Sequence, residues 1–268
     1  MKSLKLFLII IFFLTCGIQE SKGNVNSIDF NSCADYLIVT TLKVNDEEVE
    51  FLIDTGANIT VLDKELDGFS VADFGEAIDS ISGSVRVNSV LIDEIKLGTI
   101  FIENVSGLSV DLSSIKKLCP SVQGVLGNDV LSQFNYMIDY ETKKLLVSEG
   151  DITFEKSETI AFTSKGDRMH VRLDIEDQNK EFVFDSAASN VFEFTDRKIK
   201  DINALLTDHK GVNQASVVNA SLSLGKLKFR AMCGIVFSAN RDEDGLLASR
   251  VFRAFRVDNR HRKISVKM

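Results

Sequence analysis

The stretch Phe51-Leu-Ile-Asp-Thr-Gly-Ala-Asn58 decides the fold of this chain, because an apolar run ends there in an aspartate. That residue, Asp54, is followed by a small hydroxyl residue, Thr55, and then by a glycine, Gly56. A carboxylate at the end of an apolar strand is costly to bury unless other groups satisfy it. The stretch therefore predicts a partner for the carboxylate of Asp54.

A second and weaker copy of this stretch occurs later in the chain, at Phe182-Val-Phe-Asp-Ser-Ala-Ala-Ser189. A shift of 131 residues lays Asp54 on Asp185. Farther along, Gly124-Val-Leu-Gly127 recurs as Gly245-Leu-Leu-Ala248, and a short apolar strand closes each copy. Several features in the same order indicate an internal repeat, so we expect two similar halves that bring two carboxylates together.

The residues before Asp54 have the pattern of a β-hairpin. The segment Tyr36–Val44 is rich in β-branched residues, Asn45–Glu48 is a polar turn, and Val49–Ile53 is apolar again. Most other segments of the chain also favour strands over helices. The sequence therefore predicts a mainly β fold.

Helical signals are few and short. The clearest one is the segment Val130–Phe134, for which Asn128 or Asp129 is the expected N-terminal cap. Apolar content drops near residue 150, and the length of the chain suits one large or two modest domains. We expect an N-terminal domain at residues 24–150 and a C-terminal domain at residues 151–268.

The N-terminus has the pattern of an export signal. Lys2 and Lys5 precede an apolar core at Leu6–Phe13, which is too short to span a bilayer. We expect residues 1–23 to be a signal peptide, and the protein to be periplasmic or secreted. The alternative is a membrane-anchored lipoprotein with a lipid on Cys16, because the residues around that cysteine look like a degenerate lipid-attachment motif.

Composition excludes several classes of function. The net charge is −8, and an acidic chain without a basic patch disfavours nucleic acid as a partner. The cysteines after the signal, Cys33, Cys119 and Cys233, are too far apart for a zinc site, and their odd number allows at most one disulfide among them. A Cys33–Cys119 bridge is one option, and buried unpaired thiols are the other. We expect no metal and no cofactor.

The motifs together resemble a known family. The Phe51–Asn58 stretch, followed by Gly124-Val-Leu-Gly-Asn-Asp129 with Leu131 and Phe134 behind it, is similar to a lobe of the retropepsin-like aspartic proteases. The second copy makes the chain similar to the two-lobed, single-chain members of the pepsin and retropepsin superfamily. This resemblance implies two tandem β-barrel lobes with a cleft between them.

The resemblance also implies a reaction and its residues. Asp54 and Asp185 would be the catalytic dyad of an endopeptidase, and the two carboxyl groups would share one proton. The ionised carboxylate would take a proton from a water molecule, which attacks the peptide carbonyl, while the protonated one supplies a hydrogen bond. The dyad would be oriented by the hydroxyl residues and the small residues that follow each aspartate: Thr55, Gly56, Ser186 and Ala187.

A flap is expected to cover the dyad. Ser82, Gly83 and Ser84 form a small polar turn that precedes an apolar strand, and the backbone there would pair with an extended peptide. An ordinary solvent-exposed hairpin is the alternative. The expected partner is thus a polypeptide substrate in extended form, bound by a monomer.

The second copy departs from the family at two positions. Ala187 stands where glycine is usual, and Ala248 stands where the first copy has Gly127. The turn at Ala187 would then be distorted, or the two alanines would compensate as packing partners. Two other functions stay open: a non-catalytic module that binds a peptide or an envelope component through a degenerate second lobe, and a protein whose first lobe alone is competent after dimerisation.

Overall fold

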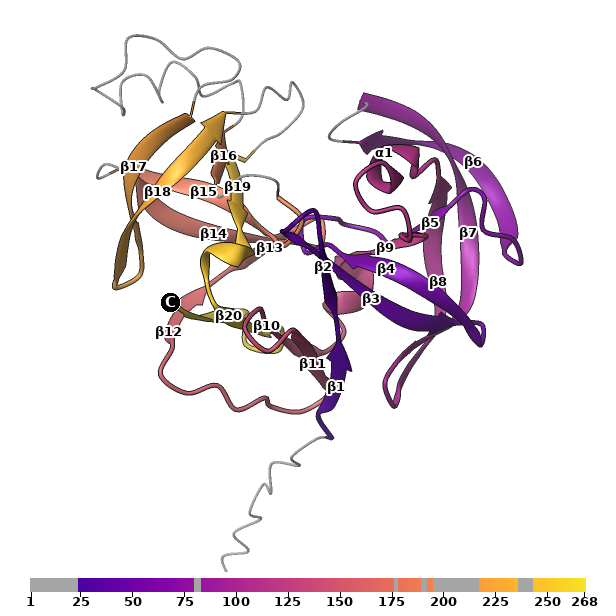
Figure 1. Cartoon of the computed structure of the whole chain (residues 1–268), viewed down its shortest axis with the longest axis horizontal. Coiled ribbons are helices and arrows are strands. Elements are labelled where there is room, and N and C mark those ends of the chain that lie inside the picture. The colour runs from indigo at the N-terminus through magenta and orange to yellow at the C-terminus, as the bar shows by residue number, and fades with distance from the viewer. Residues whose placement is uncertain (1–23, 80–82, 176–177, 189–191, 195–216, 236–242) are drawn as a thin grey trace, which may run out of the picture.

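The chain folds into two β lobes that rest on a shared third sheet. The computed structural model describes residues 24–79, 83–175, 178–188, 192–194, 217–235 and 243–268. Figure 1 shows the lobes side by side, with the third sheet at the base between them. The predicted signal peptide and Cys16 lie outside the described residues. No helix in the described part of the chain is long and apolar enough to cross a membrane.

The first lobe is an eight-stranded sheet in the order β2-β3-β4-β9-β5-β8-β7-β6. An additional pairing of β3 with β7 curls this sheet into a barrel. Its strands are β2 (Asn31–Cys33), β3 (Leu37–Val44), β4 (Glu47–Ile53), β5 (Val61–Asp63), β6 (Ser70–Asp79), β7 (Gly83–Leu97), β8 (Ile100–Val110) and β9 (Gly124–Leu126).

The second lobe is a seven-stranded sheet in the order β13-β14-β15-β19-β16-β18-β17, and β14 also pairs with β17. Strand for strand, this is the order of the first lobe without β6. Its strands are β13 (Thr163–Lys165), β14 (Arg168–Ile175), β15 (Gln178–Asp185), β16 (Phe192–Phe194), β17 (Val217–Leu224), β18 (Leu227–Ile235) and β19 (Gly245–Ala248). The mainly β, two-lobed fold expected from the sequence is confirmed.

The base sheet takes strands from both halves of the chain, in the order β1-β11-β10-β20-β21-β12. Strands β10 and β20 pair antiparallel at its centre, with Met137 opposite Arg256. Its strands are β1 (Asn26–Asp29), β10 (Asn135–Asp139), β11 (Lys144–Ser148), β12 (Glu158–Ala161), β20 (Ala254–Asp258) and β21 (Lys263–Lys267). One buried apolar core runs from this sheet into both lobes, and it includes Phe51, Tyr136, Phe182 and Phe255.

The predicted hairpin before Asp54 forms, but its turn is only two residues long, because Glu47 and Glu48 already belong to β4. Asn45 and Asp46 have φ angles of 49° and 69°, a conformation that asparagine and aspartate tolerate better than most residues. The strands pair from Val39 opposite Leu52 to Val44 opposite Glu47. In this register the last residues of β4, Phe51–Ile53, lie buried in the interior of the lobe.

The short helices differ in detail from the sequence prediction. The helix expected at Val130–Phe134 lies earlier, as α2 (Asn128–Leu131), and its N-cap is Gly127 without a side-chain cap. Neither Asn128 nor Asp129 caps it, because both side chains bond to other segments of the lobe, as described below. The other short helices within the described ranges are α1 (Ser113–Lys116) and a 3₁₀ turn at Ser249–Val251.

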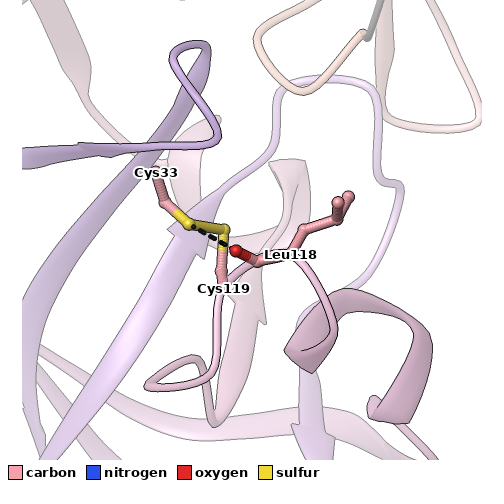
Figure 2. Close-up of a disulfide and its surroundings, with 3 residues drawn as sticks. All are labelled: Cys33, Leu118 and Cys119. Atoms are coloured by element: carbon pink, nitrogen blue, oxygen red, sulfur yellow. Dashed lines mark hydrogen bonds between the residues drawn. A yellow bond between two sulfur atoms is a disulfide. The ribbon is translucent and has the colours of Figure 1, made fainter.

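Cys33 and Cys119 form a disulfide, which was one of the two options left open by the sequence. It joins the end of β2 to the loop that follows α1 and precedes β9 (Figure 2). The carbonyl oxygen of Leu118 lies 3.2 Å from Cys33 Sγ. This is a close contact and not a hydrogen bond, because the sulfur of a disulfide carries no proton.

Candidate active site

Asp54 lies directly after β4, in a turn whose backbone N–H groups point at its own carboxylate. The N–H of Gly56 donates to Asp54 Oδ1 at 2.8 Å, and that of Ala57 donates to the same oxygen at 3.2 Å. The N–H of Asp54 donates in turn to the carbonyl of Leu126 in β9. Hydrogen bonds of this kind favour the ionised carboxylate, and they fix its direction.

Asp185 ends β15 in the same way. Its carboxylate Oδ1 accepts a hydrogen bond from the N–H of Ala187 at 2.7 Å, which matches the bond from Gly56 in the first lobe. The side chain is buried, with a relative exposure of 7% for the residue. The methyl group of Ala187 therefore leaves this hydrogen bond of the turn intact.

The two turns are joined by four reciprocal hydrogen bonds, which are made by Thr55 and Ser186. The N–H of Thr55 donates to Ser186 Oγ at 3.0 Å, and the N–H of Ser186 donates to Thr55 Oγ1 at 3.0 Å. Each hydroxyl then donates to a backbone carbonyl across the interface, Thr55 to Phe184 at 2.8 Å and Ser186 to Ile53 at 2.7 Å. Thr55 and Ser186 are almost fully buried, so these bonds hold the lobes together in the interior.

Gly56 is the point at which the first turn meets the second carboxylate. A Cβ atom added to Gly56 would lie 2.5 Å from Asp185 Cγ and 2.6 Å from Asp185 Oδ2. Only a residue without a side chain can approach a carboxylate so closely. The structure thus brings together Asp54, Thr55, Gly56, Asp185 and the Ser186-Ala187 pair, which the sequence analysis had placed at one site.

Two residues behind the first turn were missed as site residues by the sequence analysis, which treated them as helix caps and as part of the family motif. Asn128 Nδ2 donates to the backbone carbonyl of Thr55 at 2.6 Å. Asp129 accepts from both the N–H and the hydroxyl of Thr60, at 2.9 and 2.8 Å. Burial raises the pKa of Asp129, and the bonds from Thr60 oppose that rise. The signal that pointed to them was their place directly after Gly127.

A serine next to the partner strand of Asp185 was not singled out by the sequence analysis. Ser249 corresponds to Asn128, because each directly follows the Gly-apolar-apolar-small segment of its lobe. Its hydroxyl shares a hydrogen bond of 2.6 Å with the phenol of Tyr140, which comes from the end of β10. Ser249 is fully buried.

Comparison with known families bears on this arrangement. The family described as "gag-polyprotein putative aspartyl protease" matches residues 40–133, a range that contains Asp54, β9 and α2. The resemblance to the retropepsin-like aspartic proteases is confirmed. The second lobe lies outside the matched range.

A solved structure is similar to the chain along nearly its whole length. It is the crystal structure of basic 7S globulin from soybean, with a TM-score of 0.58 and 12% sequence identity. The match covers 91% of this chain and 95% of the globulin chain, so both lobes of the retropepsin-like fold are present. At this identity the likeness shows the fold alone. No curated protein sequence matches the chain.

The two alanines that depart from the retropepsin-like pattern pack in different places. Ala187 lies against a cluster of the first lobe that includes Leu37, Leu112 and Val125. Ala248 is buried in a small cluster of the second lobe, which also contains Val183, Ala188 and Leu246. The idea that the two alanines are packing partners is therefore not supported. Ala187 does not have a left-handed φ, so the backbone of the turn accepts an alanine without strain.

The expected flap lies partly outside the described residues. Strands β6 and β7 form a long antiparallel hairpin in which Asp79 pairs with Gly83 and Ile78 pairs with Ser84. Gly83 and Ser84 are thus the first residues of β7, and Ser82 lies outside the described residues. Among the described residues, no group of three or more His, Cys, Asp or Glu side chains is arranged to hold a metal ion.

Proposed function

We propose that the chain is an aspartic endopeptidase in which Asp54 and Asp185 are the catalytic dyad. The observation that carries this proposal is the contact between the second carboxylate and the first turn, with Asp185 packed against Gly56. A carboxylate is placed at the end of each of two equivalent strands, and the same backbone bond orients each one. Two carboxylates at one site favour a shared proton and acid–base chemistry.

The reaction needs only these two groups and a water molecule. The ionised carboxylate removes a proton from the water molecule, and the water oxygen forms a bond to the carbonyl carbon of the peptide. The other carboxyl group gives its proton to the carbonyl oxygen, so that a neutral tetrahedral diol forms. The carbon–nitrogen bond then breaks, the ionised carboxylate takes one hydroxyl proton, and the leaving nitrogen receives the proton that the other carboxyl group took from the water. Peptide hydrolysis is thereby complete without a cofactor.

The neighbouring residues have positioning roles in this proposal. Thr55 and Ser186 lock the two turns to each other, and the N–H groups of Gly56 and Ala187 aim the carboxylates. The β6–β7 hairpin, in which Gly83 and Ser84 begin β7, would close over an extended polypeptide by strand pairing.

Export is part of the same proposal. A disulfide between Cys33 and Cys119 suits an oxidising compartment, such as the periplasm or the extracellular space. The charge and apolar pattern of residues 1–23 agrees with removal of a signal peptide. Lipid attachment at Cys16 is the alternative, and mass spectrometry of the mature N-terminus distinguishes the two.

Two other functions compete with the endopeptidase. The similar solved structure carries the name of a globulin and not of a protease, and this favours a non-catalytic binding module as the second candidate. Dimerisation through the first lobe has less support, because Thr55 and Gly56 already contact the second lobe of the same chain. We therefore expect a monomer.

The decisive experiment replaces each aspartate separately. Asp54→Asn and Asp185→Asn should both abolish cleavage of a quenched fluorescent peptide library between pH 3 and pH 7. Asp151→Asn serves as the control, because this aspartate is exposed and lies outside the site. Retained cleavage in both dyad variants would refute the peptidase. A wild-type protein that binds peptides in the cleft without cutting them would support the binding module.

A further inference from the structure

Tyr140 is fixed at both its backbone and its side chain. Its N–H donates to the carbonyl of Arg253 at 2.9 Å, which pins the end of β10 to the second half of the chain. Its ring packs edge-on against Phe30, with 6.2 Å between the ring centroids. Its hydroxyl shares the 2.6 Å hydrogen bond with Ser249 Oγ. A phenol held at three points has little freedom to move.

The bond to Ser249 lies next to the second carboxylate. Strands β15 and β19 pair in parallel with Asp185 opposite Ala248, and Ser249 is the next residue along the chain. Burial is the main cause that raises the pKa of Tyr140, and the charge of Asp185 raises it further. The phenol is thus bonded to the residue that directly follows the partner of Asp185 in β19.

The first lobe fastens its own turn differently. There, Asn128 reaches the carbonyl of Thr55 directly, within one lobe. Asn259 follows the second-half strand β20 as Tyr140 follows β10. Its side chain donates to the carbonyl of Leu131, the last residue of α2, and to that of Phe134, just after the helix. Tyr140 of the first half thus bonds to Ser249 in the second half, and Asn259 of the second half bonds to the α2 segment of the first half. Of these two side chains, only Tyr140 carries a hydroxyl.

We propose that Tyr140 is a positioning residue for Asp185. It acts through Ser249, which it holds in the interior directly after the strand that pairs with Asp185. Tyr140 belongs to the first half of the chain, so the first half sets the geometry of the Asp185 carboxylate. This geometry is kept although Ala187 stands where glycine is usual. This inference rests on the proposed endopeptidase function.

Kinetics of full-chain variants test the role. Tyr140→Phe keeps the ring and removes the hydroxyl, and it should lower kcat about tenfold with KM within about twofold of wild type. Ser249→Ala should do the same, and Ser249→Thr should retain most of the activity. If the losses from Tyr140→Phe and Ser249→Ala multiply in the double variant, the two residues act separately and the proposal fails.

A matched control separates positioning from simple stability. Thr159 and Ser265 share a hydroxyl hydrogen bond of 2.8 Å elsewhere in the base sheet. Thr159→Val should lower the melting temperature about as much as Tyr140→Phe, with kcat unchanged. A Tyr140→Phe variant that loses stability but keeps the wild-type kcat would overturn the inference.

A titration gives a reading that does not depend on activity. Carboxyl carbon NMR, with the Asp185 signal assigned by means of Asp185→Asn, follows the ionisation of this residue. Tyr140→Phe should move its midpoint upward, because a looser turn weakens the N–H bond to the ionised form, whereas Thr159→Val should leave it in place. An unmoved midpoint would overturn the role of Tyr140. A wild-type chain that cleaves no peptide would refute the endopeptidase and leave this titration to decide on Tyr140.

Discussion

Gly56 is the residue at which the geometry of the two turns is least tolerant. Its replacement by alanine would force the carboxylate of Asp185 to move, because the added methyl group would lie 2.5 Å from Asp185 Cγ. We expect Gly56→Ala to lower kcat/KM about a hundredfold in a peptide-cleavage assay, since small displacements of reacting groups have effects of this size. The reverse change in the other turn, Ala187→Gly, should be tolerated. Equal losses in the two variants would contradict this account.

His170 marks a chemical difference between the lobes at equivalent positions. His170 lies in β14 and pairs with Val183 of β15. At the equivalent position of the first lobe, Val39 of β3 pairs with Leu52 of β4. The residue is buried, and within the described part of the chain neither ring nitrogen has a hydrogen-bond partner. Nδ1 lies 3.5 Å from an oxygen of Glu181. Burial lowers the pKa of His170, and it outweighs the attraction of that carboxylate.

This histidine should make the stability of the protein depend on pH. The charged groups that act on it are Glu181, Arg168, Glu243 and Lys165. As pH falls below about 6.5, the unfolded chain binds a proton at His170 before the folded chain does, so stability is lost. Urea unfolding at pH 7.5 and pH 5 should show a smaller loss for His170→Val than for wild type. Identical losses would show that His170 titrates alike in both states.

At the scale of elements, the disulfide stabilises the loop that carries α1. The bridge spans 86 residues of sequence, so it restricts the unfolded chain strongly. Reduction should lower the free energy of unfolding by about 2–4 kcal/mol, as measured by urea titration with and without reductant. The Cys33→Ser, Cys119→Ser double variant should not respond to reductant. An equal response from that variant would assign the effect to another thiol.

Sequence reasoning located the elements of the site well, because the elements are set by local patterns. The hairpin before Asp54 follows from β-branched residues around a polar turn, and both aspartates follow from their place at strand ends. The roles of Asn128 and Tyr140 could not be found in this way. A side chain that caps a helix and one that bonds to a distant carbonyl look alike in sequence, and the partner of Tyr140 lies 109 residues away.

At the scale of the whole molecule, both halves of the site lie in one chain. The specific activity of the wild-type protein should therefore stay constant when the protein is diluted from micromolar to nanomolar concentration. A total activity that falls with the square of the protein concentration would indicate an obligate dimer. Light scattering at the same concentrations gives the mass of the species that is active.

The lobes should also unfold as one unit. The base sheet takes strands from both halves, and the Thr55–Ser186 bonds join the lobes in the interior. Calorimetry should show a single transition whose calorimetric and van't Hoff enthalpies agree. Thr55→Val removes the hydroxyl from these cross-lobe bonds and should split or broaden that transition. Two separate transitions in wild type would contradict the coupling.

The pairing at the centre of the base sheet has a consequence for how the chain can be divided. Met137 faces Arg256, and each holds the same place in its own half, so the approximate twofold axis passes between them. Arg256 also donates to the carbonyl of Ile152, in the segment that connects the halves. A symmetric assembly of two second halves would place the Arg256 of one copy directly opposite the Arg256 of the other. The second half should therefore be a poor partner for another copy of itself, because like charges directly opposite each other destabilise a strand pair.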